Sequence, residues 1–143
     1  MADSDIGVRF SAAGLLGRLG PEANSAVPAL KGLLTDTDWQ VRRKAATGLW
    51  FIARDTNAVC TLIADAEKAI QLRSAATGPE LIAALNMLDE LGASVKPIAP
   101  AILQSLVIDG EQTPIQDEFH RRIREVVARI DPAVDESLKP HAR

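Results

Sequence analysis

The stretch LGRLGPEANSAVPAL, residues 16–30, contains the features that decide the fold. It opens with two leucines three residues apart, which is the spacing of one face of a helix. Gly20 and the proline after it form a strong turn signal. Pro28 then stands inside a second apolar segment, where proline is harmless only in the first turn of a new helix. The stretch therefore predicts a helix, a turn and a second helix that begins near Ser25.

The same pattern recurs three times downstream. The matching apolar pairs are Leu16/Leu19, Leu49/Ile52, Leu88/Leu91 and Val127/Ile130. Self-similarity at a period of about 20–50 residues is typical of stacked-repeat proteins. We therefore expect one all-α domain, residues 1–143, built from about three and a half helical units. The predicted units are 5–36, 38–73, 77–108 and 113–133, followed by a C-terminal tail at 134–143.

Polar residues indicate where the first helix of each unit begins. Asp5 and Asp38 each stand three residues before a valine of the apolar stripe, and a carboxylate there can accept the free backbone N–H groups of a helix start. Thr77 and Thr113 are each followed three residues later by Glu or Gln, which is the capping-box pattern. Gly92 follows the last apolar residue of the third unit's first helix and is expected to end it.

The first two units share short motifs. They are Val-Arg at 8–9 and 41–42 and Ala-Ala at 12–13 and 45–46, and the first unit continues with Leu-x-x-Leu-Gly-Pro at 16–21 and Ala-Val-Pro-Ala-Leu at 26–30. These motifs resemble HEAT repeats, most closely those of phycobilisome-lyase-like HEAT proteins. The resemblance implies an α-solenoid, a right-handed superhelix of antiparallel helix pairs with first helices on the convex side and second helices lining a concave side. It also implies a protein-binding scaffold.

The resemblance further implies a ladder of one Asp and one Arg per repeat along the stack. In the first two units the matching pairs are Asp5 with Arg9 and Asp38 with Arg42. In the later units these positions hold Thr77 with Leu81 and Gln116 with His120. The ladder is therefore expected to stop halfway.

Charge and hydropathy argue against nucleic acid and membrane partners. The net charge is −3, whereas a protein that uses phosphates for affinity needs a basic face. The basic clusters at 42–44 and 121–124 lie beside Asp38, Glu118 and Glu125, which favours a salt-bridged helix surface. No apolar run approaches the length of a membrane-spanning helix, and the first residues are polar. A cytoplasmic protein is the resulting expectation.

Reactive residues are sparse. Cys60 is the single cysteine and aligns with packing positions of the other units, so we expect it to be a core residue. His120 and His141 are the only histidines, too few for a typical zinc or iron site. Neither a nucleophile elbow nor a phosphate-binding loop occurs. The sequence therefore predicts no catalysis, no metal and no cofactor.

Three aromatic residues depart from the repeat pattern. Trp39, Trp50 and Phe51 lie where the other units mostly have small or charged residues. Aromatic residues are enriched in binding hot spots, so these three are candidates for a partner-binding patch. The alternative is that the long segment 57–73 folds over Trp50 and Phe51. We favour burial for Trp50 and leave Phe51 open.

A scaffold that binds a protein or peptide on a curved surface is the expected function. Polar positions of the second helices are the groove candidates: Lys31, Thr35, Asp65, Lys68 and Gln104. One alternative is a regulatory or lyase-like module that assists an enzyme or holds a tetrapyrrole, and another is a fragment of a larger HEAT-repeat protein. Phe10 is expected to face a preceding repeat or to cap the first helix, and we predict weak self-association through an end face.

Overall fold

The computed structural model describes residues 5–71, 77–104, 106 and 114–137, and within these ranges it contains helices and no β-strand. The first helices of the units are α1 (Ile6–Leu19), α3 (Trp39–Ala53), α5 (Thr77–Leu91) and α7 (Pro114–Ile130). The second helices are α2 (Val27–Leu33), α4 (Thr56–Gln71), α6 (Ala99–Gln104) and α8 (Pro132–Ser137). Two 3₁₀ segments, η1 (Gly20–Ala26) and η2 (Gly92–Ile98), connect α1 to α2 and α5 to α6.

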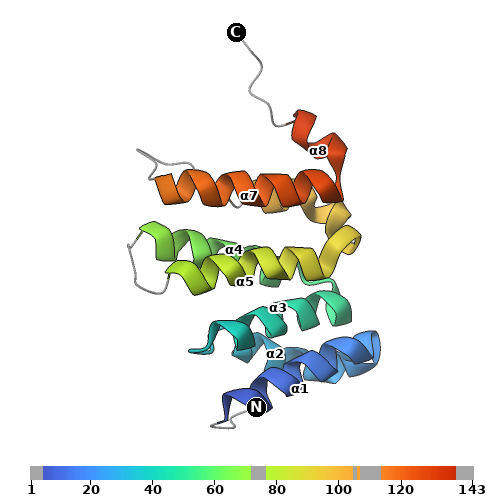
Figure 1. The fold of residues 1–143 in the computed structure, drawn as a ribbon. Helices are drawn as coiled ribbons and strands as arrows, with labels where there is room; N and C mark the ends of the chain where they lie inside the picture. Colours follow the sequence, from blue (N-terminus) through green and yellow to red (C-terminus); the bar gives the residue numbers. More distant parts are fainter. Residues whose placement is uncertain (1–4, 72–76, 105, 107–113, 138–143) are drawn as a thin grey trace.

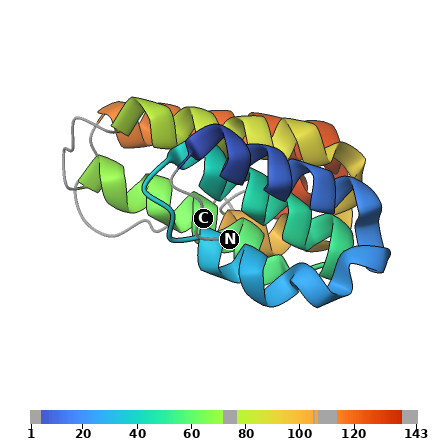
Figure 2. The ribbon, with the colours of Figure 1, turned by 90° about the horizontal axis from the view of Figure 1, so that it is seen from below.

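The first helices stack in chain order. Helix α3 packs against α1, α5 against α3, and α7 against α5. These four helices form the stack of near-parallel helices in Figure 1. Seen along the stack in Figure 2, α2 and α4 lie to one side of the layer formed by α1, α5 and α7. The predicted all-α, HEAT-type solenoid is confirmed.

The predicted helix starts are confirmed where the structure describes them. The Asp5 carboxylate accepts hydrogen bonds from the backbone N–H groups of Gly7 and Val8. Asp38 caps α3 in the same way. Helix α5 begins at Thr77, but the side chain of Thr77 is not described and Thr113 lies outside the described residues.

Glycine ends two of the first helices. Gly20 has φ 62° and Gly92 has φ 50°, in the left-handed region that glycine adopts at low cost. The chain then makes a 3₁₀ segment before the second helix starts. As a result α2 begins at Val27, slightly later than predicted, with Pro28 in its first turn.

The described contacts of Arg9 and Arg42, the two arginines of the expected ladder, centre on Asp36. The Arg9 guanidinium binds Asp36, with Nε 2.7 Å from Oδ2 and Nη2 3.0 Å from Oδ1. Asp36 follows the end of α2, and its side chain is 7% exposed. Arg42 donates to the backbone carbonyl of Asp36 at 2.7 Å. The Arg9 hydrogen bond holds the pKa of the Asp36 carboxyl below its usual value of 3.8.

At the ladder positions of the fourth unit, the structure has a buried polar cluster instead. The Nε2 atom of His120 lies 2.7 Å from Oε2 of Glu67, and Gln116 donates to Oε1 of Glu67 at 3.3 Å. All three residues are buried. Because Glu67 belongs to α4, the cluster ties the second unit directly to α7 of the fourth.

Candidate functional site

An open groove with a volume of about 700 Å³ lies between α1 and α3, with α5 along one edge. From α1 it is lined by Phe10, Ser11, Ala13, Gly14, Leu15, Gly17 and Arg18; from α3 by Lys44, Thr47, Gly48 and Phe51; and from α5 by Glu90. The size falls within the range of about 300–1,000 Å³ that is usual for ligand sites.

Small residues create this hollow. Gly17 and Gly48 face each other, so closely that a Cβ atom added to Gly17 would lie 3.0 Å from the Cα atom of Gly48. Gly14 also lines the groove and contributes no side chain of its own. The two helix backbones therefore approach at the floor, and space stays open above them between the larger side chains.

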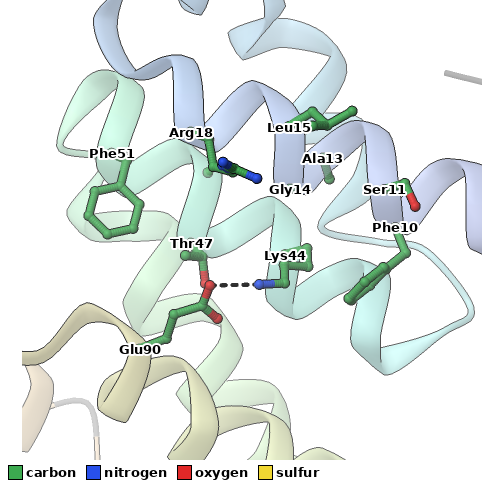
Figure 3. Close-up of a pocket in the computed structure, with 12 residues that line it drawn as sticks. Phe10, Ser11, Ala13, Gly14, Leu15, Arg18, Lys44, Thr47, Phe51 and Glu90 are labelled. Carbon is green, nitrogen blue, oxygen red and sulfur yellow. Dashed lines mark hydrogen bonds and ion pairs between the residues drawn. The ribbon is translucent and has the colours of Figure 1, made fainter.

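Two phenylalanines stand at opposite ends of the groove. Figure 3 shows Phe51 at one end and Phe10 at the other. Both are half-buried and pack against the hydrophobic core. The Lys44 ammonium lies 5.7 Å from the centroid of the Phe10 ring, a cation–π contact. Phe10 thus faces α3, which corrects the expectation that it faces a preceding repeat or caps the end of α1.

The polar groups of the groove differ in how well they are paired. Glu90 accepts from Arg43 at 2.5 Å and from Lys44 at 2.6 Å, so its charge is compensated. The Thr47 side chain is buried, yet its hydroxyl has no hydrogen-bond partner among the described residues. Arg18 is exposed, and none of the described residues pairs with its guanidinium. The Arg18 cation is therefore the polar group of the groove that remains for a bound molecule, since the Thr47 oxygen is buried.

The structure places the three predicted aromatic residues in different surroundings. Trp50 is 3% exposed, its indole N–H donates to Ser94 of η2 at 2.9 Å, and the Arg54 guanidinium lies 5.3 Å from its ring centroid. The predicted burial of Trp50 is confirmed, and a buried indole offers a partner little surface. Trp39 is half-buried at the first residue of α3. Of the three, only Phe51 lines the groove.

The polar candidates of the second helices lie outside this groove. Lys31, with a side chain 57% exposed, pairs with Asp55 at 3.2 Å. The Thr35 hydroxyl donates to the backbone carbonyl of Gly32, and Asp65 is half-buried. Lys68 and Gln104 are exposed. A role of these five residues in partner binding stays a prediction.

The sequence did not predict this groove. The residues predicted to line a groove belong to the second helices, whereas the groove lies between first helices. The available signal was the set of small residues on two neighbouring first helices, Gly14 and Gly17 with Gly48. Small residues at helical spacing allow close backbone approach, which leaves a furrow where large side chains flank them.

The two basic clusters are salt-bridged, as predicted. Arg43 and Lys44 share Glu90. In α7, Arg121 and Arg122 both bind Glu118, and these hydrogen bonds hold the pKa of Glu118 below its usual value.

The residues that the structure describes contain no group of three or more His, Cys, Asp or Glu side chains placed to hold a metal ion. None of the helices described is both long and apolar enough to cross a membrane. The cytoplasmic location stays a prediction.

Comparison with known proteins adds one finding. Residues 1–78 match the family model for HEAT repeats. No curated protein and no solved structure matches the chain significantly. The resemblance to the phycobilisome-lyase-like subgroup stays a prediction. Since it covers more than half of the 143 residues and agrees with the stacked helices, the chain belongs to the HEAT-repeat family.

Proposed function

We propose that this protein is an interaction scaffold that binds an amphipathic peptide segment of a partner protein in the groove between α1 and α3. HEAT repeats are commonly protein-interaction scaffolds and are generally non-catalytic. The observation that carries the proposal is the combination of apolar walls with the exposed guanidinium of Arg18, with which none of the described residues pairs.

The groove residues define the chemistry of the bound segment. Phe10, Leu15 and Phe51 offer apolar surface for large aliphatic or aromatic side chains. Glu90 already pairs with Arg43 and Lys44, so it does not compensate the charge of Arg18. A carboxylate of the bound segment, near the Phe51 end of the groove, would pair with Arg18. A segment with apolar anchors and one acidic residue therefore complements the site.

Binding would be passive. The two backbones meet at Gly17 and Gly48, so the groove floor is close-packed and has little freedom to rearrange. A preformed site loses little conformational entropy on binding. The lining includes neither histidine nor cysteine, and its one carboxylate is held in two ion pairs, so the proposed role is binding without catalysis.

A displayed library of random peptides, selected on the immobilised chain, tests the proposal. Enriched peptides should combine large apolar residues with Asp or Glu. Their binding should weaken about tenfold or more with Phe51→Ala and with Arg18→Glu, since each contact contributes on the order of 1–3 kcal/mol. Lys68→Glu, an exposed change on α4, is the matched control and should leave binding unchanged.

The opposite pattern would overturn this assignment. If selected peptides tolerate both groove variants but are lost with Lys31→Glu or Lys68→Glu, the binding surface lies on the second helices. A tetrapyrrole is the second candidate ligand, favoured by the two phenylalanines and Arg18 in the groove. Titration with biliverdin addresses it: a Phe51-dependent shift of the absorbance band would support the tetrapyrrole, and an unchanged spectrum excludes it.

A further inference from the structure

An apolar stripe runs along the outer side of α1, at the end of the stack. Its members are Val8, Ala12, Leu15 and Leu19, spaced by four, three and four residues. The side chains of Val8, Leu15 and Leu19 are large, and these residues are 49%, 61% and 56% exposed. This 4-3-4 spacing is the seam of a helix that packs against another helix.

The equivalent stripe is covered in every later unit. In α3 the positions hold Val41, Ala45, Gly48 and Ile52; in α5 the described ones hold Ala84, Met87 and Leu91; in α7 they hold Phe119, Ile123, Val126 and Ile130. All of these residues are buried except Ile130, which is half-buried and packs against the core. Among the described first helices, only α1 has an exposed stripe.

The packing of α3 shows which neighbour covers the stripe. Gly48 occupies the position of Leu15, and a Cβ atom added there would lie 3.3 Å from the backbone oxygen of Ala13 and 3.6 Å from the Cα atom of Gly17. The stripe thus faces the preceding first helix. Helix α1 lies at the bottom of the stack in Figure 1, and its own stripe is exposed.

The opposite end of the stack does not complement this surface. Helix α7 exposes Arg121 and Arg124 there, and Arg121 is paired with Glu118 and Glu125. Head-to-tail contact with a second copy would bury these charges against leucine and valine, which is unfavourable. The uncharged stripe of α1 has no such conflict with a copy of itself.

We propose that α1 binds α1 of a second copy, antiparallel, around a two-fold axis. The 4-3-4 spacing reads the same in both directions, so an axis between Ala12 and Leu15 places Val8 opposite Leu19 of the second copy. It also places Ala12, a small residue, opposite Leu15. Every contact then pairs a residue with a complementary one, as a two-fold interface requires.

The dimer is expected to be weak. One helix against another buries less than the about 1,200 Å² of a standard interface, so we expect a dissociation constant on the order of 0.1 mM. Leu15 also lines the peptide groove. Val8 and Leu19 do not line it, and variants at these two positions test the dimer separately from the proposed function.

Sedimentation equilibrium of the full chain over a concentration series gives the test. The unmodified chain should shift from monomer towards dimer as its concentration rises, while Val8→Glu and Leu19→Lys should each weaken association at least about tenfold. Both changes suit their helix ends, since the carboxylate lies in the first turn and the ammonium in the last, so folding should be retained. The control is Ile115→Glu, a 55% exposed residue in the first turn of α7, which should leave dimerisation unchanged.

Mixing the two variants tests the register. The antiparallel arrangement brings the carboxylate introduced by Val8→Glu in one chain opposite the ammonium introduced by Leu19→Lys in the other. An equimolar mixture should therefore recover association that neither variant shows alone. A chain that stays monomeric throughout the series overturns the proposal. So does association that Val8→Glu leaves intact, or a mixture that stays monomeric. Peptide binding by Val8→Glu reports separately on the groove.

Discussion

Gly17 of α1 and Gly48 of α3 lie so close together that a single methyl group added to Gly17 would come within 3.0 Å of the Cα atom of Gly48. Both neighbours of that methyl group are backbone atoms, which cannot move aside as the end of a flexible side chain can. The pair therefore sets the distance between the first two units and the depth of the groove beside it.

Gly17→Ala should lower the free energy of unfolding by about 1–3 kcal/mol, because the added methyl group forces the two helices apart. Chemical denaturation followed by circular dichroism measures it. Gly32→Ala is the control: it also lies within a helix, but no atom lies within 4 Å of the added Cβ. The control should stabilise the protein by up to about 1 kcal/mol through helix propensity. Equal effects at both glycines would contradict the close-packing argument.

Acid should weaken the link between Arg9 and Asp36. The pKa of Asp36 lies below its usual value of 3.8 in the folded protein, so the stabilisation is fully present above that value. It is lost as the pH falls through the folded pKa, because the unfolded chain then binds the proton more readily. Unfolding measured from pH 6 to pH 2 should show a shallower loss of stability for Asp36→Asn than for the unmodified protein. Parallel curves would contradict the assignment.

Replacing only Glu67 in the buried cluster should lower the free energy of unfolding more than replacing both Glu67 and His120. Glu67→Leu leaves His120 without its Glu67 hydrogen bond in the interior, for an expected loss of about 1–3 kcal/mol. The double variant Glu67→Leu with His120→Leu should recover much of that loss, since apolar groups replace both. Equilibrium unfolding of the two single variants and the double variant gives the coupling energy. Additive losses would show that the contact contributes nothing of its own.

The two tryptophans should differ in their access to solvent. Trp50 is buried and Trp39 is half-buried, so iodide should quench the fluorescence of Trp50→Phe more strongly than that of Trp39→Phe. Trp50→Phe should also be less stable by about 1 kcal/mol, because it loses the hydrogen bond to Ser94. Ser94→Ala is the control for that bond. Equal quenching of the two variants would contradict the described burial.

Cys60 should react slowly with thiol reagents. Partial burial raises the pKa of its thiol above the usual 9.0, so little of the reactive thiolate forms at neutral pH. The rate of reaction with Ellman's reagent should rise strongly when the protein is unfolded in guanidinium. A folded rate equal to the unfolded rate would contradict the prediction.

The repeat pattern of the sequence was sufficient to predict the architecture of stacked helices. The helix starts at Asp5 and Asp38 and the helix ends at Gly20 and Gly92 follow from local backbone chemistry, which neighbouring residues determine almost entirely. The burial of Trp50 was also predicted correctly. Its hydrogen-bond partner Ser94 was not, because Ser94 lies in the next unit and no local sequence pattern marks the pair.

Contacts between side chains that lie far apart in the sequence were harder to predict from the sequence. Arg9 donates to Asp36, at the far end of its own unit, and the sequence suggested only the nearby Asp5 as a partner. Glu67 meets His120 only because α4 reaches α7, and helix spacing within one unit gives no information on that. The groove was missed for the same reason, since it depends on how closely two helices approach.

The contact between Glu67 and His120 has a consequence for how the array unfolds. In most repeat proteins each unit touches only its immediate neighbours, so units can fray from the end one after another. Here α4 of the second unit contacts α7 of the fourth across the intervening one. The last unit cannot detach without breaking the hydrogen bonds that Gln116 and His120 make to Glu67 in the middle of the array, which favours one cooperative transition for the whole stack.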